Sequence, residues 1–439
     1  MCCIEAEIWN FHQDLPLSPE NIFPLRKKRV RKSWLSPSLF HDTLYFSFSN
    51  KNNFVDTMDI TKFAIPEIIF GRGSLRHVAP CAQRLGARRI LLVSEEGIEQ
   101  AGWVEKLRKM LSAEGIEQAY YSNVSSNPRD FQIEEGARFY REQKADVILA
   151  IGGGSTLDTA KGIAIIASNG GKISDYEGAN QVHNPLPPML FITTTAGSGS
   201  DVSQFCIVTS VERQVKMAII SRTLIPNISI IDPLLLSTIS RTQIIYSAVD
   251  AIAHAVEAYL SIISSPLTEL HSLRAVDKIL AALPQAAENK SFDAMEELSL
   301  ASLSAGIAFS NASLGSEHAL AHSLGGHFDM PHGVVHPILL PAFMRYNLDF
   351  AEKKLARLGE VILNRRQGND RETALAGIAR LEEFFGTLGV STRLRDEVPP
   401  EKRNLLKEVC QMAVNDACTL TNPRPTSAHE LLTVCEEVW

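Results

Sequence analysis

The sequence predicts an α/β protein in which a parallel sheet covered by helices forms the N-terminal half and helices alone form the C-terminal half. Apolar runs of strand length alternate with amphipathic helical patterns between residues 89 and 151, as in strand–helix–strand units. After residue 233 helical patterns follow one another and strand signals almost vanish. A chain of 439 residues is also too long for one compact core, so two domains are expected.

The composition argues against two classes of partner. Hydrophobic residues make up 45% of the chain and charged residues 21%, close to the average for globular domains. The net charge of −7 argues against general binding to nucleic acid or to anionic membranes. No apolar run reaches the roughly 18 residues that a membrane-spanning helix needs. We therefore expect no nucleic-acid partner and no membrane association.

The seven cysteines are scattered along the chain and include no Cys-x-x-Cys pair. They are Cys2, Cys3, Cys81, Cys206, Cys410, Cys418 and Cys435. This usage is typical of a reducing compartment rather than of a disulfide-stabilised protein or a cysteine-ligated zinc site. The pattern therefore predicts a cytoplasmic protein.

Residues 1–57 differ from the rest of the chain, because no helical or strand period runs through them. They contain four prolines, a basic run at 26–32 and a polar stretch at 49–53. The basic run alone could indicate nuclear import or nucleic-acid binding, but nothing else in the chain supports that interpretation. Two interpretations remain: a disordered leader, or a start codon assigned too early. We favour the second, with Met58 as the working first residue, since regular patterns begin directly after it.

The elements expected after residue 58 alternate between strand and helix. Buried strands are expected at 89–93, 118–124 and 146–151, and helices at 103–113 and 130–143. Strands separated by helices of this length predict a parallel, doubly wound sheet. Between residues 190 and 232 the helical patterns stop, and short strands are expected, including 215–220 and 228–231.

The second half of the chain has helical patterns at 242–262, 268–283, 294–310 and 371–388. We place a domain boundary near residues 233–240. This gives an α/β domain at 58–236 and an all-helical domain at 237–439, and it predicts an active site in the cleft between adjacent domains.

A glycine-rich turn follows the strand expected at 146–151. Gly152, Gly153 and Gly154 precede Ser155, and a helical pattern begins near Leu157. Glycines let the backbone approach a ligand closely, and the helix N-terminus offers unpaired N–H groups, so the turn predicts a pyrophosphate site. It lies at the carboxyl end of a central parallel strand, where open α/β sheets bind ligands. The turn is not the GxGxxG fingerprint.

Two further segments could serve the same ligand. A loop of hydroxyl and glycine residues at 193–200 follows the strand expected at 189–192, although an ordinary Ser/Gly loop has the same composition. Glu95 follows the strand at 89–93, where an acidic side chain can accept the ribose hydroxyls of NAD and repel the 2′-phosphate of NADP. The sequence therefore favours NAD, with a solvated loop carboxylate as the alternative.

The first indication of a metal site is on the helix expected at 242–262. Asp250 and His254 are four residues apart, so both project from one face of that helix. Their neighbours are apolar, and burying a carboxylate and an imidazole there is costly unless they pair or bind a cation. Taken alone, the two residues are more typical of a satisfied core pair than of a metal site.

The remaining candidates lie among the five histidines between residues 318 and 336. His318 and His322 repeat the four-residue spacing on a second expected helix, and His332 follows a proline in a loop. Two such helices and a loop histidine outweigh the interpretation as a core pair. Imidazole and carboxylate ligands suit Fe²⁺, Zn²⁺ and Mn²⁺. The spacing leaves both His318 and His322 as candidate ligands. His327 and His336 are expected to be structural or cleft-lining.

These motifs resemble the iron-dependent (group III) alcohol dehydrogenase family, which includes lactaldehyde reductase, 1,3-propanediol dehydrogenase and butanol dehydrogenases. The match covers residues 58 to 439 and rests on five motifs in the same order and spacing. They are the GGGS…D…K stretch at 152–161, the TTAGSGS loop at 194–200, the Asp250/His254 helix, the histidine-rich block at 318–333 and the TNPRP segment at 421–425. The resemblance implies a Rossmann-like nucleotide-binding domain and an all-α metal-binding domain, arranged as in dehydroquinate synthase-like proteins.

The resemblance also implies a role for each site residue. It implies that the metal, Fe²⁺ with Zn²⁺ as the alternative, is bound by Asp250, His254, His318 and His332. It implies that His322 is the catalytic histidine beside substrate and nicotinamide. The implied cofactor is NAD, and the cofactor-binding residues are Glu95, Gly152, Gly153, Gly154, Ser155, Asp158, Thr193, Thr194, Ser198 and Lys216.

This chain departs from the family pattern at four positions. Ser198 and Asp201 stand where the family usually has threonine and glutamate, and Glu95 stands where aspartate is common. Glu317 precedes a metal ligand where small or aliphatic residues are usual. The changes at Ser198 and Asp201 are conservative, so we expect weaker or shifted cofactor contacts rather than their loss. Glu95 keeps the negative charge and so the preference for NAD.

The activity implied by the resemblance is the interconversion of primary alcohols or diols and aldehydes by hydride transfer with NAD. His322 and the cofactor ribose would relay the proton. A homo-oligomer is also implied. Two alternatives remain, namely a phosphate-substrate enzyme of the same superfamily, which would need clustered Lys and Arg side chains, and a dehydrogenase-like sensor or regulator.

Overall fold

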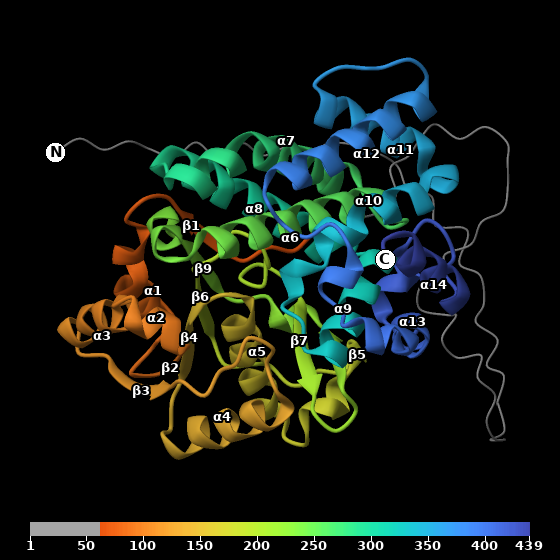
Figure 1. Ribbon diagram of the computed structural model, residues 1–439. Helices are drawn as coiled ribbons and strands as arrows, with labels where there is room; N and C mark the ends of the chain where they lie inside the picture. Colours follow the sequence, from red (N-terminus) through yellow and green to blue (C-terminus); the bar gives the residue numbers. More distant parts are fainter. Residues whose placement is uncertain (1–61) are drawn as a thin grey trace, which may run out of the picture. The chain divides into compact units, whose positions relative to one another are not determined.

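The computed structural model describes residues 62–439, which form one compact unit. The expectations for residues 1–57, including the early start codon and the basic run, lie outside the described residues. In the described part all strands precede residue 232 and helices follow, as Figure 1 shows in colour order. The predicted fold class is therefore confirmed, while the domain boundary at 236 stays a prediction.

Six parallel strands form the main sheet, in the order β1-β9-β6-β4-β2-β3. Their bounds are β1 (Glu67–Phe70), β2 (Arg89–Ser94), β3 (Glu117–Tyr121), β4 (Val147–Gly152), β6 (Met189–Thr193) and β9 (Ile228–Ile231). The strand expected at 118–124 ends earlier than predicted, because Val124 N donates to Ser122 O at 2.8 Å and closes a tight turn.

Alternate side chains of the central strands pack on opposite faces of this sheet, so two helical layers cover it. Leu91 of β2 and Ile148 of β4 belong to the core that contains α4 and α5, whereas Leu92 and Leu149 belong to the core that contains α1 and α3. The helices are α1 (Val78–Arg84), α2 (Glu96–Gln100), α3 (Trp103–Ala113), α4 (Asp130–Glu142) and α5 (Gly154–Asn169).

A second, smaller sheet was not foreseen as a separate sheet, and its strands lie in sequence between β4 and β9 of the main one. Its strands are β5 (Gly178–Ala179), β7 (Phe205–Ser210) and β8 (Val215–Ile220), in the order β5-β8-β7. β7 and β8 pair antiparallel, with Ile207 opposite Ala218. This pair carries Lys216, one of the predicted cofactor residues, on β8.

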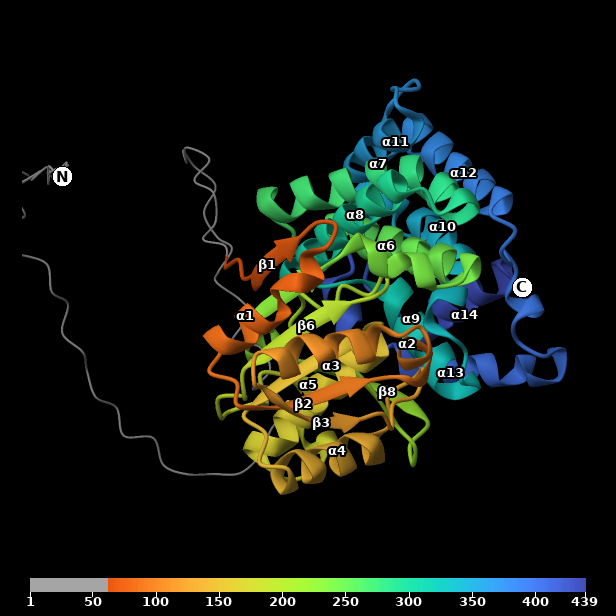
Figure 2. The ribbon, with the colours of Figure 1, turned by 90° about the vertical axis from the view of Figure 1, so that its left-hand side faces the viewer.

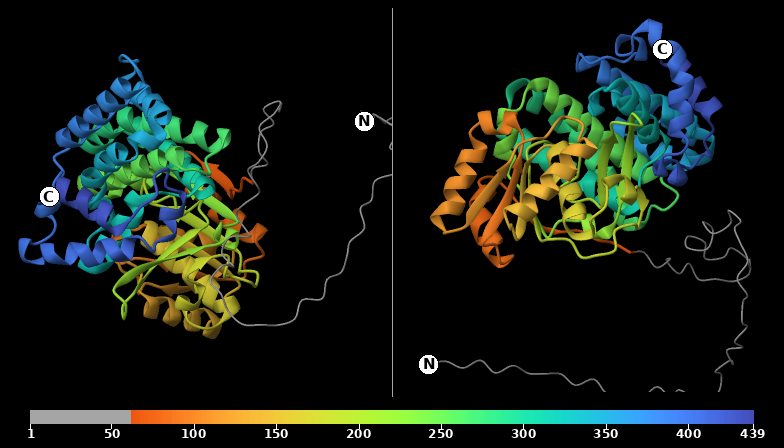
Figure 3. Two further views of the ribbon diagram at one scale, coloured as in Figure 1. Left: turned by 90° about the vertical axis from the view of Figure 1, so that its right-hand side faces the viewer. Right: turned by 90° about the horizontal axis from the view of Figure 1, so that it is seen from below.

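The second half consists of helices joined by short 3₁₀ turns. The helices are α6 (Arg241–Leu260), α7 (Pro266–Asn289), α8 (Phe292–Ala312), α9 (Ser316–Phe328), α10 (His336–Tyr346), α11 (Leu348–Leu363), α12 (Asp370–Thr387), α13 (Leu406–Ala413) and α14 (Ala428–Glu437). Figures 1 and 2 both show α6, α7 and α8 lying together beside the sheet half. In the two views of Figure 3 the last helices, in blue, lie away from the orange helices of the sheet.

Helix α6 lies at the centre of the helical half. Its first turn is closed by a capping box, in which the Ser240 side chain accepts from Gln243 N and the Gln243 side chain accepts from Ser240 N. Almost every residue from Ile244 to Leu260 is buried, and its apolar side chains belong to the largest core of the helical half. A helix buried on all sides holds its polar residues in fixed positions. Among the described helices, none has the length and apolar character to cross a membrane.

The strand order reverses direction between β2 and β4. From β2 the chain goes outward to β3, and then returns to the other side of β2 with β4. Open α/β sheets bind ligands in the crevice at such a reversal, outside the carboxyl ends of the strands. Glu95 follows β2 there and Gly153 follows β4, so the topology brings the two predicted cofactor segments together.

Candidate metal centre and nucleotide cleft

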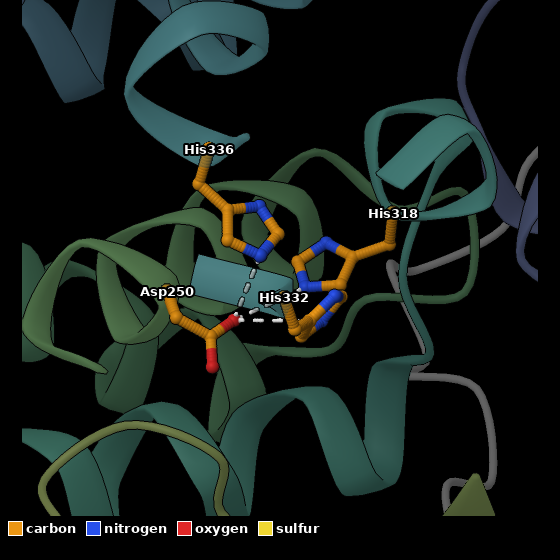
Figure 4. A group of neighbouring side chains, drawn as sticks. All are labelled: Asp250, His318, His332 and His336. Atoms are coloured by element: carbon orange, nitrogen blue, oxygen red, sulfur yellow. Dashed lines mark ion pairs between the residues drawn. The ribbon is translucent and has the colours of Figure 1, made fainter. Parts of the chain in front are cut away.

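Four histidine side chains converge on one oxygen atom of Asp250. The Nε2 atoms of His336, His254, His318 and His332 lie 3.2, 3.5, 3.6 and 3.9 Å from Asp250 Oδ1. Figure 4 shows the rings of His318, His332 and His336 around the Asp250 carboxylate. The donor atoms of Asp250, His318, His332 and His336 all lie within 4.8 Å of one another.

The nitrogen–oxygen distances in this cluster are close to those between two ligands of one cation. Two ligands that each bind one cation at about 2.1 Å, with about 90–120° between them, lie about 3.0–3.6 Å apart. Three of the four nitrogen–oxygen distances fall in that range, and the His332 distance of 3.9 Å is slightly longer.

The buried atoms of this cluster lack ordinary partners. Asp250 Oδ1, His318 Nε2 and His336 Nε2 are buried and have no hydrogen-bond partner among the described residues. Leaving a buried donor or acceptor unpaired costs about 1–3 kcal/mol. A divalent cation bound by these atoms would satisfy all three, so the residues present fit a metal ion.

Two buried glutamates hold the rings of the cluster by their other nitrogen. His318 Nδ1 lies 2.5 Å from Glu257 Oε2 and 3.1 Å from Glu317 Oε2. His336 Nδ1 lies 2.9 and 3.1 Å from the two oxygens of Glu317. A carboxylate on Nδ1 fixes the ring and leaves Nε2 to bind a metal, which is the usual environment of a metal-ligating histidine.

The charges of the cluster are arranged to hold a cation. Burial by itself raises the pKa of Asp250, but His254, His318 and His336 outweigh it and keep that pKa well below its usual range. Burial lowers the pKa of His254 to about 3, so this imidazole is neutral and able to bind a metal. Burial also lowers the pKa of His336, yet Glu317 and Asp250 raise it to about 9. The cluster therefore contains an ionised Asp250, and its carboxylates favour a positive charge at the same place.

The structure brings together all four residues that were expected to bind the metal, and it adds a fifth. Asp250, His254, His318 and His332 face one point, and His336, expected to be structural or cleft-lining, approaches closest to Asp250. His332 and His336 are a third pair of site residues that lie four residues apart. This spacing could have identified His336 as a candidate ligand from the sequence. His327 lies outside the cluster, with its ring against Phe328.

His322 lines the same cavity but is held by a different carboxylate. Its Nδ1 lies 2.8 Å from Asp416 Oδ2, next to the 3₁₀ turn at Ala417–Thr421. Burial alone raises the pKa of Asp416, but His322 and the backbone N–H of Cys418 keep it below its usual range. The ring of His322 stacks on that of His332 at 5.3 Å between centroids. His322 therefore lies beside the metal cluster with a partner of its own, and sequence reasoning missed that partner.

The predicted phosphate turn opens helix α5. Gly153 is the N-cap residue, and no described side chain caps this helix N-terminus. A Cβ atom on Gly154 would come within 2.7 Å of Ser198 Cβ, so the two loops touch and only glycine fits. Uncapped N–H groups at the start of a long helix form a site for an anion.

Glu95 reaches this turn from the end of β2. Gly153 N donates to Glu95 Oε1 at 3.3 Å, so the carboxylate lies next to the phosphate turn. This position at the strand-order reversal is the one at which an acidic side chain meets a ribose. The geometry supports the expected place of Glu95.

The loop at 193–200 contributes one of the three residues expected from it and one that was not singled out. Thr193 and Thr194 are buried, and Thr194 N donates to Gly152 O at 3.0 Å, so these residues join β6 to the end of β4. Ser198 lines the cavity as expected, and Thr195 lines it where Thr193 and Thr194 do not. Backbone pairing between neighbouring strands turns Gly152, Thr193 and Thr194 to the interior, and the next residues of the loop reach the ligand side.

Two charged residues of the motifs connect helix α5 to the second sheet. Asp158 lines the cavity, accepts from Ser200 Oγ at 2.6 Å and accepts from Ile207 N at 3.2 Å. Buried Lys161 donates to Ser203 O at 2.9 Å and Phe205 O at 2.7 Å. Lys161 therefore anchors β7 to α5, while Asp158 presents a buried carboxyl group to the cavity.

Two further loop and strand residues have distinct places. Lys216 lines the cavity, and burial lowers its pKa to about 8, although Asp250 and Asp329 oppose the shift. Asp201, a departure from the family pattern, is buried and accepts from Ser229 Oγ at 2.9 Å. Asp201 thus supports strand β9 from inside the protein.

One cavity of about 350 Å³ joins the phosphate turn to the metal cluster. At one end it is lined by Glu95, Gly153, Gly154, Ser155 and Ser198, and at the other by Asp250, His254, His318, His322 and His332. Apolar side chains of Tyr246, Phe309 and Leu314 complete its wall. An anion site and a cation site in one cavity allow a dinucleotide and a small substrate to meet beside the metal.

Comparison with known proteins gives a consistent match over the described residues. A sequence model described as iron-containing alcohol dehydrogenase matches residues 66–233, and one described as Fe-containing alcohol dehydrogenase family, C-terminal, matches residues 244–439. The 1,3-propanediol dehydrogenase of Klebsiella pneumoniae is 36% identical over 385 residues, which cover 86% of this chain and 98% of that protein.

Two further relatives extend the match. The NAD-dependent methanol dehydrogenase of Bacillus methanolicus is 31% identical over 375 residues, which cover 85% of this chain and 98% of that protein. A crystal structure of 1,3-propanediol oxidoreductase superposes with a TM-score of 0.82 at 35% identity, and covers 87% of this chain and 100% of that chain.

Proposed function

The chain belongs to the iron-containing alcohol dehydrogenase family, and on that premise we propose that it interconverts small primary alcohols or diols and aldehydes with NAD(H). The single observation that carries this proposal is the cavity that joins an anion site at a helix N-terminus to a carboxylate–imidazole cluster. The family matches confirm the expected resemblance.

We assign the metal to the cluster around Asp250, with His254, His318 and His332 as ligands and Fe²⁺ as the resident ion. Bound there, a divalent cation would supply Lewis acidity toward an alcohol hydroxyl, and a nicotinamide dinucleotide would supply the hydride acceptor. The unpaired buried atoms of the cluster support this assignment, because a bound cation would satisfy them.

His322 is the residue we assign to proton transfer. Because Asp416 stays ionised, its carboxylate accepts from His322 Nδ1 and leaves Nε2 as the nitrogen that can take up a proton. A side chain in this role contributes about 10²–10⁴-fold to a rate. The position of His322 in the cavity wall, beside but outside the Asp250 cluster, supports this assignment.

The phosphate turn at Gly153 and Gly154 is assigned to the pyrophosphate of NAD. Uncapped N–H groups of α5 bind the phosphates, and Ser155 and Ser198 supply hydroxyl groups beside them. Glu95 accepts hydrogen bonds from a ribose and repels a 2′-phosphate. These contacts favour NAD over NADP.

The size and lining of the cavity favour a small substrate. About 350 Å³ is at the lower end of the range for ligand pockets, and this space is shared with the nucleotide. Phe309 and Leu314 present apolar surface near the cluster, which excludes water from the reacting atoms. We therefore propose alcohols of two to four carbons.

A phosphate-bearing substrate is disfavoured by the same lining. Among the described residues that line the cavity, Lys216 is the one Lys or Arg side chain. An enzyme that binds a substrate phosphate besides the cofactor needs a cluster of such groups. A purely sensory role is disfavoured by the metal cluster, which a sensor has no need to keep.

We also propose a cytoplasmic homo-oligomer. Five cysteines of the described part are free and buried, which suits a reducing compartment. Exposed apolar side chains at Ile262, Ile263, Leu267 and Leu270, near the start of α7, supply surface for contact with a second copy.

The proposal is tested by NADH formation with a panel of alcohols of two to four carbons, together with metal analysis of the purified protein. His254→Ala should lose bound metal and turnover together, and His327→Ala, outside the cluster, is the matched control. Turnover that survives complete loss of metal would contradict the assignment of the metal to the reaction.

A further inference from the structure

His336 approaches Asp250 from the protein side rather than from the cavity. It is the first residue of α10, and its side chain is 0% exposed. Among the described residues, His254, His318 and His332 line the cavity, and His336 does not. Its Nε2 is nevertheless the imidazole nitrogen nearest to Asp250 Oδ1, at 3.2 Å.

The two facing atoms of His336 and Asp250 are both unpaired. His336 Nε2 and Asp250 Oδ1 are buried, and neither makes a hydrogen bond with any described residue. A buried polar atom without a partner is costly, and here two such atoms face each other. A cation that both atoms bind removes both penalties at once, and 3.2 Å is a suitable separation for two ligands of one ion.

Glu317 holds the His336 ring in the orientation that ligation needs. Both oxygens of Glu317 lie against His336 Nδ1, at 2.9 and 3.1 Å, and this carboxylate is fully buried. The same pattern is present at His318, whose Nδ1 lies against Glu257. A carboxylate on Nδ1 selects the tautomer whose Nε2 lone pair is available to a metal. The His336 ring is therefore held by a carboxylate at Nδ1 in the same way as the His318 ring.

We propose that His336 Nε2 is a fifth protein ligand of the metal, and that Glu317 holds its ring in the ligating orientation. This inference rests on the proposed function, because it needs a metal bound at Asp250. Since His336 does not line the cavity, ligation by its Nε2 would take no cavity space from the substrate.

A fifth protein ligand changes which ion the site prefers. Zn²⁺ sites in proteins are mostly four-coordinate, whereas Fe²⁺, Mn²⁺ and Co²⁺ accept more ligands. With five protein donors and one substrate atom, the site suits a six-coordinate ion. His336 thus offsets the general advantage that Zn²⁺ has over Fe²⁺ in affinity for nitrogen and oxygen ligands.

The test compares four proteins loaded with Co²⁺: the wild type, His336→Ala, Glu317→Gln and the control His327→Ala. His327 lies on α9, close to the cluster in sequence but outside it, so its removal deletes an imidazole without touching the site. X-ray absorption counts the imidazole ligands of the ion, the visible spectrum reports its coordination number, and competition with a chelator reports its affinity.

We expect four imidazole ligands in the wild type and three in His336→Ala. The visible absorption of Co²⁺ should intensify in that variant, because absorption strengthens as the coordination number falls. Glu317→Gln should weaken Co²⁺ binding by about 10–100-fold, the usual effect of losing a carboxylate behind a ligand, and His336→Ala by at least as much. The ratio of Zn²⁺ to Co²⁺ affinity should rise in both variants.

A Co²⁺ spectrum, imidazole count and affinity in His336→Ala equal to those of His327→Ala would overturn the inference, and would make His336 an imidazolium hydrogen-bonded between two carboxylates. Should His336→Ala fail to fold, the imidazole count of the wild type decides the question, because Glu317 also lies 3.1 Å from His318 Nδ1 and its replacement affects both rings. Absence of Co²⁺ and Fe²⁺ binding by the wild type would instead defeat the proposed function.

Discussion

His322 Nδ1 lies 2.8 Å from Asp416 Oδ2, although 94 residues separate the two in sequence. The contact joins helix α9 to the 3₁₀ turn near the C-terminus and is buried on both sides, with 5% and 7% of the two side chains exposed. It fixes the imidazole ring through its Nδ1 atom, which donates a hydrogen bond to the carboxylate. The histidine in the cavity wall is therefore positioned by a carboxylate that does not itself belong to the metal cluster.

Replacing Asp416 by asparagine should lower kcat by about 10–100-fold, because the ring loses the charged partner that orients it. The metal content and the KM for NADH should stay close to wild type, since Asp416 touches neither site. Steady-state kinetics with metal analysis checks this. Asp396→Asn, at an exposed position, is the control, and an equal loss of metal and kcat in Asp416→Asn would mean a structural role.

Gly154→Ala should weaken nucleotide binding without removing the metal. The added Cβ would come within 2.7 Å of Ser198 Cβ, and such overpacking costs about 1–3 kcal/mol, or roughly 10- to 100-fold in the KM for NADH. Gly386→Ala is the matched control, because a Cβ there meets nothing within 4 Å. Equal KM values for the two variants would show that the turn does not contact the cofactor.

Glu95→Gln should relax the preference for NAD over NADP. The amide can still accept from Gly153 N, but it lacks the charge that repels a 2′-phosphate. The ratio of kcat/KM for NADPH to that for NADH should rise about tenfold or more, since like charges in contact cost several kcal/mol. Glu96→Gln, at the next residue and outside the cavity lining, should leave this ratio unchanged.

Nucleotide binding by the metal-free protein should weaken as the pH rises through about 8. Burial lowers the pKa of Lys216 to about 8, so its ammonium group is present below that pH and is lost above it. An anionic dinucleotide is attracted by the charged form, so its Kd should increase about tenfold across this range, which corresponds to about 1.4 kcal/mol.

Fluorescence titration of NADH from pH 6.5 to 9.5 measures this dependence. Lys216→Met should bind more weakly and without the inflection, whereas Lys216→Arg should keep the charge and bind across the whole range. An inflection near pH 8 that persists in Lys216→Met would assign the titration to another group.

The sequence alone was sufficient for the elements that depend on local pattern. The runs at 89–93 and 146–151 became β2 and β4, and the helical periods at 242–262 and 371–388 became α6 and α12. The i, i+4 spacing of Asp250 and His254 gave a shared helix face. The glycine-rich turn was recognised by its composition, and the structure gives a steric reason for Gly154, whose Cβ would come within 2.7 Å of Ser198 Cβ.

Other features depended on contacts between distant residues, which no local pattern carries. The unusual residue Glu317 is visible in the sequence, but only the folded chain brings its carboxylate into contact with His336. Thr195 replaced Thr193 and Thr194 at the cavity because strand pairing turned the earlier residues inward. The second sheet likewise arose from pairing of β5 with β8 across about 40 residues of chain.

By itself, then, the sequence determined the order of strands and helices and the chemical types available to the site, because spacing dictates which side chains share a face. Only the tertiary structure decided which imidazoles meet at one carboxylate oxygen. Asp250, His318 and His336 come from three helices, and the packing of those helices, not the spacing within any of them, sets the separations between their donor atoms.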